Sequence, residues 1–292
     1  MIKSLWMLVA SLLFALMAAF ARMGASDFSA LELVFYRSAF GAAVIALWVW
    51  AQGFTLRTPL VRAHFMRSFL GTFALTIWFY AISKLPLGTA MTLNYTSPLF
   101  MAAIVSYLAV RAGEALEKKL IACVIFGFFG ITLILRPDVG ASDLMPSLIG
   151  SSAGFFAALA QFQVRQLAKM REPAWRIVFY FTLTGTVAGV IGHFLWEGPL
   201  TAITFDNVWA LAGMAVSGVI AQLAMTRAWS GGNVLVTSCF QFSAIIFASL
   251  IGWISFDEPI SLLTGTGIGV IIIAGVTATL ETRKKKKPET QS

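Results

Sequence analysis

Long runs of apolar residues, each close to the length of a membrane-spanning helix, recur along this chain of 292 residues. A helix rises about 1.5 Å per residue, so about 20 residues cross the hydrocarbon core of a bilayer. Short connections containing Pro or Gly separate the runs and predict where the helices end. The ten predicted spans cover approximately residues 5–21, 31–50, 65–83, 88–110, 120–135, 145–164, 175–196, 208–228, 234–256 and 260–280.

Composition supports the same class of protein. Hydrophobic residues make up 59% of the chain and charged residues only 12%, about half the charged fraction of a soluble domain. We therefore expect an all-α membrane protein. The first run also has features of a signal peptide, namely Lys3 followed by an apolar stretch and small residues. Its removal would leave the first half one span short of the second, so we expect a retained helix.

The chain matches itself at an offset of 144 residues without a gap. Residues 34–36 (Val-Phe-Tyr) recur at 178–180, and Gly41 falls on Gly185. A fixed long period indicates a duplicated unit, and five spans per unit would insert the second unit upside down. We predict two inverted five-helix repeats around a central cavity: residues 1–143, residues 144–282, and a basic cytoplasmic tail at 283–292.

Basic residues in the connections predict the orientation. If the N-terminus is cytoplasmic, 17 of the 21 Lys and Arg residues lie on the inside, so both termini are expected in the cytoplasm of a bacterium, with the chain crossing the inner membrane many times. Glu114 then lies in an inner connection and Glu258, its copy, in an outer one, as inversion requires. The residues placed inside are Lys3, Arg57, Arg62, Arg67, Arg111, Lys118, Lys119, Arg165, Lys169, Arg171, Arg176, Arg227, Arg283 and Lys284 to Lys287.

Charged residues inside a membrane are costly and mark functional sites, and the predicted spans contain few. Arg37 is placed near an outer helix end, and the predicted interior holds no carboxylate pair, metal cluster, phosphate-binding glycine loop or room for an ATPase domain. We expect a protein that is not an enzyme, uses no cofactor or metal, and binds membrane lipid but no nucleic acid.

Neutral polar and aromatic residues gather in five of the predicted spans and suggest a solute pathway. Helix-to-helix hydrogen bonding is the alternative explanation for each residue taken singly. Pro98 removes a backbone donor, and the carbonyl that it frees must be satisfied by protein or by water in a cavity. Trp78 and Gln222 are 144 residues apart and would face one site from two sides. The candidate substrate-binding residues are Trp78, Tyr80, Asn94, Tyr95, Ser97, Gln161, Gln163, Gln222, Ser238 and Gln241.

These features resemble the drug/metabolite transporter superfamily, specifically its EamA-type exporters, over nearly the whole chain. The family's units typically carry a Pro in the fourth helix, a Gly-Glu step and a glycine-dotted fifth helix. The first unit shows Pro98, Gly113-Glu114, Gly127 and Gly130, whereas the second has Phe242 in place of the Pro. Within the family, the chain is most similar to exporters of aromatic amino acids. The resemblance implies a central cavity lined by helices one, three, four, six, eight and nine. The second unit's matching residues are Asp257-Glu258, Gly265, Gly267, Gly269 and Gly275.

We therefore expect a secondary transporter that exports small metabolites by alternating access, with neutral, apolar or aromatic amino acids as substrates. Two alternatives stay open: an exporter of drugs or quaternary cations, bound through aromatic rings, and a passive solute channel. The expected assembly is a monomer or a loosely associated dimer. The expected hinges are Pro86, Pro98, Gly231 and Gly232.

Overall fold

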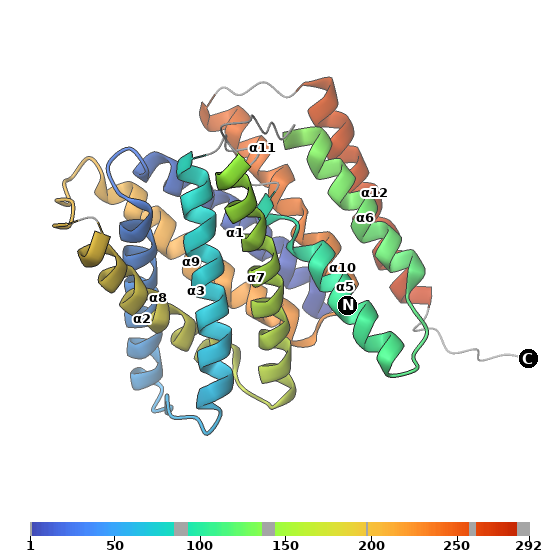
Figure 1. Ribbon diagram of the computed structural model, residues 1–292, viewed down its shortest axis with the longest axis horizontal. Coiled ribbons are helices and arrows are strands. Elements are labelled where there is room, and N and C mark those ends of the chain that lie inside the picture. The colour runs from blue at the N-terminus through green and yellow to red at the C-terminus, as the bar shows by residue number, and fades with distance from the viewer. Residues whose placement is uncertain (1, 85–92, 136–143, 197, 257–260, 285–292) are drawn as a thin grey trace, which may run out of the picture.

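The computed structural model describes residues 2–84, 93–135, 144–196, 198–256 and 261–284, and every regular element in these ranges is a helix (Figure 1). The helices are α1 (Ile2–Gly24), α2 (Ala30–Ala51), α3 (Val61–Lys84), α5 (Ser97–Arg111), α6 (Lys118–Leu135), α7 (Leu144–Lys169), α8 (Ala174–Trp196), α9 (Val208–Gly231), α10 (Val234–Gln241), α11 (Ser243–Phe256) and α12 (Leu262–Lys284).

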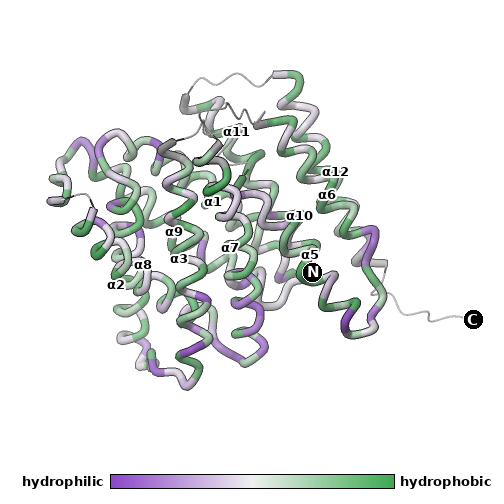
Figure 2. Tube along the Cα trace, in the orientation of Figure 1, coloured by the Kyte–Doolittle hydropathy of each residue, from purple (hydrophilic) through white to green (hydrophobic). Residues whose placement is uncertain are grey.

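Six stretches within the described ranges are long and apolar enough to cross a membrane, and α5 is a shorter apolar helix. Hydrophilic residues gather at the helix ends and in the connections, with apolar stretches between them (Figure 2). The protein is thus an all-helical, multi-pass membrane protein, as the sequence predicts. The stretches are 2–24, 30–51, 174–196, 208–231, 234–255 and 262–281.

Two predicted spans, 88–110 and 234–256, are not continuous helices in their described parts. A turn at Tyr95 and Thr96 precedes α5, which begins at Ser97 with Pro98 in its first turn. Proline fits a helix start because the amide that it lacks has no helical partner there. In the second unit α10 ends at Gln241, and α11 follows after one residue, Phe242. Under the 144-residue offset Phe242 corresponds to Pro98, so the two breaks lie close to each other but are not aligned.

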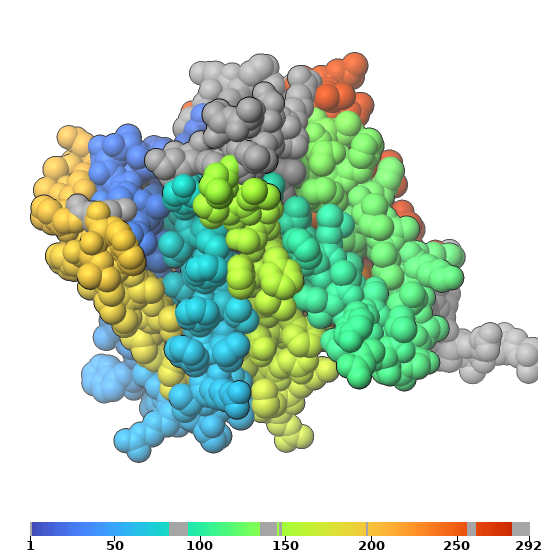
Figure 3. Space-filling model, in the orientation of Figure 1, coloured from blue at the N-terminus to red at the C-terminus, as the bar shows by residue number. Residues whose placement is uncertain are grey.

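The helices pack in four main pairs: α1 with α9, α2 with α8, α3 with α7, and α6 with α12. The α2–α8 and α6–α12 pairs lie at opposite edges of the bundle (Figure 1). Across one face, α3, α7, α5 and α6 lie side by side (Figure 3). Under the repeat, α1 corresponds to α7 and α3 to α9, so the α1–α9 pair corresponds to the α7–α3 pair. Every main pair therefore joins one half of the chain to the other.

The α2–α8 pair shows the correspondence at the level of single residues. A Cβ atom on Gly41 would lie 2.8 Å from Thr182 Cγ2, and one on Gly185 would lie 2.5 Å from Ser38 Oγ. Gly185 and Thr182 are the repeat counterparts of Gly41 and Ser38. Each helix thus places a glycine against a small hydroxyl residue of the other helix, which lets the two backbones approach closely.

Candidate substrate site

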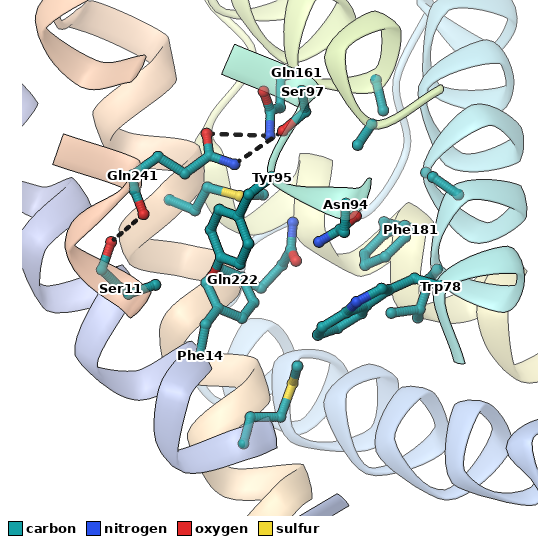
Figure 4. Close-up of a pocket in the computed structure, with 18 of the residues that line it drawn as sticks. Ser11, Phe14, Trp78, Asn94, Tyr95, Ser97, Gln161, Phe181, Gln222 and Gln241 are labelled. Carbon is teal, nitrogen blue, oxygen red and sulfur yellow. Dashed lines mark hydrogen bonds between the residues drawn. The ribbon is translucent and has the colours of Figure 1, made fainter. Parts of the chain in front are cut away.

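A cavity lies where the helix pairs meet, and side chains from both halves of the chain line it (Figure 4). Its volume is about 120 Å³, below the ~300–1,000 Å³ of drug-sized ligand pockets. Helices α1, α3, α5, α7, α9 and α10–α11, which the family resemblance implies, contribute, and α2 and α8 add Arg37 and Phe181. The lining residues are Met7, Ser11, Phe14, Met17, Arg37, Arg67, Gly71, Ala74, Leu75, Trp78, Asn94, Tyr95, Ser97, Ala157, Ala160, Gln161, Phe181, Gln222, Met225, Gln241 and Ala244.

Amide and hydroxyl groups form one side of the cavity. Gln241 Nε2 donates to Ser97 Oγ at 3.1 Å, and Gln161 Nε2 donates to Gln241 Oε1 at 3.5 Å. Ser11 Oγ lies 3.2 Å from the carbonyl of Phe240 and 3.4 Å from that of Gln241. These neutral groups can exchange hydrogen bonds with a polar solute (Figure 4).

The helix breaks place these groups. At the first break, Thr96 Oγ1 donates to the Leu93 carbonyl at 2.6 Å, which satisfies a backbone acceptor that helix continuation would have used. Gly154 on α7 allows the approach, because a Cβ atom there would lie 2.8 Å from the Leu93 carbonyl oxygen. Asn94, Tyr95 and Ser97 consequently line the cavity. The structure thus places three residues of this run on the cavity wall, and Pro98 starts a helix rather than interrupting one.

Aromatic rings form another wall. Trp78, Tyr95, Phe14 and Phe181 line the cavity, and Trp78 is only 8% exposed. Trp78 and Phe181 lie close together on one side, with Gln222 opposite them (Figure 4). Such rings can bury the apolar body of a solute while the amides bind its polar groups.

Two buried arginines also line the cavity, and here the sequence analysis was wrong. Arg37 and Arg67 are 3% and 2% exposed. We expected Arg37 near a helix end and Arg67 in an inner connection. Because α2 begins at Ala30 and α3 at Val61, both residues lie about two turns inside their helices. The predicted neutral lining therefore carries two positive charges, and one of them comes from α2, which the family resemblance does not imply as a lining helix.

The two guanidinium groups share a neighbour. Arg37 Nη2 donates to Gln222 Oε1 at 3.4 Å, and its Nε lies 3.3 Å from Met17 Sδ. The Phe181 ring centre lies 5.6 Å from Arg37 Cζ and 4.2 Å from Arg67 Cζ, a cation–π geometry. Phe181 lies 144 residues after Arg37 and is its repeat counterpart. The two copies differ in residue type, and the arginine of one contacts the ring of the other.

Glycines make room for both arginines. A Cβ atom on Gly218 would lie 3.0 Å from Arg37 Nε and from Met17 Sδ, and one on Gly71 would overlap Arg67 Nη1. Both positions are helical, so the glycines cost helix stability of about 1 kcal/mol each. The space that they leave fixes where the guanidinium groups lie.

The remaining predicted residues have mixed placements. Trp78, Asn94, Tyr95, Ser97, Gln161, Gln222 and Gln241 line the cavity together. Tyr80 is 37% exposed and Gln163 half-buried, and neither lines it, while Ser238 is fully buried within α10. Among the expected hinges, Gly231 ends α9, Gly232 caps it, and Pro98 lies in the first turn of α5. Pro86 lies outside the described residues.

Sequence reasoning missed Arg37, Arg67, Phe181 and Ser11. A usable signal was present for one pair: Arg37 follows the repeated Val-Phe-Tyr run, and Phe181 follows its copy. An arginine that directly follows a repeated apolar motif indicates a position within a helix rather than at its end.

A polar cluster joins two connections at one end of the bundle. Glu172, between α7 and α8, accepts hydrogen bonds from Thr58 Oγ1 and, at 2.9 Å, from Arg176 Nη1. Arg176 Nη2 also donates to the Thr55 carbonyl at 2.9 Å, and His64 Nε2 lies 3.6 Å from Glu172 Oε2. Burial alone would raise the pKa of Glu172, but the bonds from Thr58 and Arg176 and nearby positive charge lower it below its ordinary value. The charged carboxylate thus links the two halves.

Comparison with known proteins defines the class. The profile of the EamA-like transporter family matches residues 1–136. The pseudopaline exporter CntI of Pseudomonas aeruginosa is 28% identical over 94% of this chain and 95% of its own length. The riboflavin transporter of Vibrio cholerae is 28% identical over 97% and 95%. The S-adenosylmethionine uptake transporter of Rickettsia bellii is 23% identical over 83% and 81%.

One crystal structure of a protein superimposes with a TM-score of 0.83 at 20% identity, over 96% of this chain and 98% of that one. At this identity it shows the fold alone. The named relatives are transporters rather than enzymes, and the chain resembles them over most of its length. The matches make the chain similar to EamA-like transporters, with the family profile covering its first 136 residues. They do not single out aromatic amino acid exporters.

Proposed function

We propose that the protein is a secondary transporter that exports small metabolites of the amino-acid type through the central cavity. The observation that carries this proposal is a polar and aromatic cavity between the two halves of an otherwise apolar helix bundle. Groups that bind a carboxylate, groups that hydrogen-bond an amine or amide, and rings that cover an apolar side chain all face the same space. An amino-acid-like solute would use all three.

The proposed motion is a rocking of two inverted units, residues 1–143 and 144–282, around that cavity. Support comes from the reciprocal packing of α2 on α8 and from a family match that ends at residue 136, close to the proposed boundary. Four pairs of residues 144 apart line the cavity: Met17 with Gln161, Arg37 with Phe181, Trp78 with Gln222, and Ser97 with Gln241. A site shared by two moving units would draw on both in this way.

The breaks before α5 and between α10 and α11 are the proposed flexible points. Their residues keep few backbone bonds of a regular helix, so they can absorb changes in dihedral angle at low cost. The Glu172 cluster ties the α2–α3 connection to the α7–α8 connection. We assign it the role of an inner lock, which closes when the cavity faces outward and opens when it faces the cytoplasm.

The relatives' names span export, transport and uptake, and three different solutes. We therefore infer the direction of transport and the substrate from the cavity. A quaternary-cation exporter would meet repulsion from Arg37 and Arg67, with no carboxylate among the described lining residues to offset it. The same lining predicts weak or no obligatory proton coupling, since it offers no acidic side chain to carry the proton.

Counterflow in proteoliposomes tests the proposal and separates a carrier from a channel. Vesicles loaded with an excess of one unlabelled amino acid should accumulate the labelled form transiently and with saturation, and a protonophore should leave the initial rate within about twofold. Non-saturable equilibration would support the channel instead. Failure of all tested amino acids and organic acids to show counterflow would refute transport of this class.

A further inference from the structure

The cavity contains two positive charges with unused hydrogen-bond donors. Arg37 Nη1, Arg67 Nε and Arg67 Nη1 are buried and have no hydrogen-bond partner among the described residues. A buried donor without a partner is costly, and a buried charge without one costs more. Both arginines are more than nine-tenths buried and line the cavity, so their free donors are available to a solute there.

The protein itself offers little compensation. Within the described ranges, the ion pairs that join side chains involve His64, Glu172, Arg176, Lys119 and Glu281, and none includes Arg37 or Arg67. Gln222 supplies a single neutral acceptor to Arg37, and its own Nε2 is buried without a hydrogen-bond partner in the part of the chain that the structure describes. The Phe181 ring attracts both cations but accepts none of their in-plane N–H bonds.

We propose that the transported solute is an organic anion with two acidic oxygen groups, which Arg37 and Arg67 bind together. This inference rests on the proposed function and narrows its substrate class from metabolites of the amino-acid type to those that are net-negative. A guanidinium presents parallel N–H donors that match a carboxylate or a phosphate group in a two-bond geometry. Two such groups on one solute would use the free donors of both arginines and neutralise both charges.

The rest of the lining fixes how such a solute would lie. Gln222 and Asn94 can bind an amino or amide group next to the acids, and Trp78 can cover the carbon skeleton (Figure 4). The Gln161–Gln241–Ser97 chain lies further along the cavity and can bind a second polar end. Gly71 and Gly218 leave the space that the two arginine side chains occupy, and a larger residue at either position would displace the arginine next to it.

Counterflow with three labelled probes tests the inference: L-phenylalanine as the neutral solute, L-glutamate as the dicarboxylate and glycerol 3-phosphate as the phosphate ester. The anions should exceed L-phenylalanine at least tenfold in initial rate, and the preferred one identifies the acidic group. Arg67→Gln should lower anion counterflow at least tenfold. Arg67→Lys should fall between, because it keeps the charge but loses the paired donors. Arg62→Gln, at an exposed position of the same helix, is the matched control and should behave as wild type.

A binding readout covers the case in which a variant folds poorly. In detergent, the preferred anion should raise the melting temperature of the wild type and of Arg62→Gln, and should do so less for Arg37→Gln. Counterflow of L-phenylalanine equal to or above that of both anions, with an unchanged preference in Arg67→Gln, would overturn the anion inference but leave the transporter intact. Absence of counterflow and of melting shifts for every probe would instead count against the proposed function.

Discussion

Gln241 donates a hydrogen bond of 3.1 Å to Ser97, and the two residues are 144 positions apart, so each is the repeat counterpart of the other. Ser97 begins α5 and Gln241 ends α10. The contact therefore joins the helix breaks of the two halves across the cavity. In a pair of units related by a two-fold axis, equivalent residues meet each other only close to that axis.

A double-mutant cycle measures how strongly this contact joins the halves. Ser97→Ala and Gln241→Ala should each destabilise the protein in detergent, and the coupling energy should be about 0.6 kcal/mol, as for other hydrogen bonds between membrane helices. The measurement is reversible unfolding of the two single variants and the double variant. Strictly additive effects would mean that the bond contributes nothing to the resting state.

Trp78 and Tyr80 lie on different sides of helix α3. Sequence reasoning placed both in the site, but only Trp78 lines the cavity, while Tyr80 is 37% exposed. Trp78→Leu should reduce counterflow of L-glutamate and L-phenylalanine at least tenfold, because the ring that covers the solute is lost. Tyr80→Leu is the control and should stay within about twofold of wild type. Equal losses in both variants would place the solute path elsewhere.

Gly71→Ala tests whether the position of Arg67, and not only its charge, matters. The added methyl group would displace the guanidinium, which is the flexible end of a long side chain, so the protein should still fold, with a stability change of about 1 kcal/mol or less. Transport should nevertheless fall about tenfold. Gly275→Ala, where the nearest atoms lie at an ordinary 3.6 Å, should leave transport unchanged. Normal flux in Gly71→Ala would show that the exact place of Arg67 is unimportant.

The Glu172 cluster predicts a pH-dependent contribution to stability. Because the pKa of Glu172 is lowered in the folded protein from its ordinary 4.5, its contribution is present above pH 4.5 and is lost as the pH falls through the lowered value. Glu172→Gln should therefore lower the melting temperature at pH 7, because the hydrogen bonds from Thr58 and Arg176 lose the charge that strengthens them. The difference from wild type should shrink steadily below pH 4.5. A difference that is constant from pH 7 to pH 3 would exclude this role.

The sequence predicted the class and most helices, and seven of the ten candidate residues line one cavity, because apolar length and neutral polar residues inside a span are local signals. It missed Arg37 and Arg67 because both fall in the first two turns of their predicted spans, 31–50 and 65–83, where an arginine was assigned to the membrane boundary. Helix α3 also begins four residues earlier than predicted, which places Arg67 deeper in its helix. It missed the cation–ring contact of Phe181, since a phenylalanine in an apolar run carries no mark of its partner.

The central claim is that the cavity between the halves opens to each side of the membrane in turn. Ser97→Cys, in a background where the buried Cys123 and Cys239 are replaced by Ala, places a thiol in the cavity. A membrane-impermeant maleimide should label it in both right-side-out and inside-out vesicles, and a bound transported solute should slow labelling from each side. Ala102→Cys, on the same helix but buried outside the cavity, should resist labelling from both. Labelling of Ser97→Cys from one side only, or from neither, would contradict alternating access through this cavity.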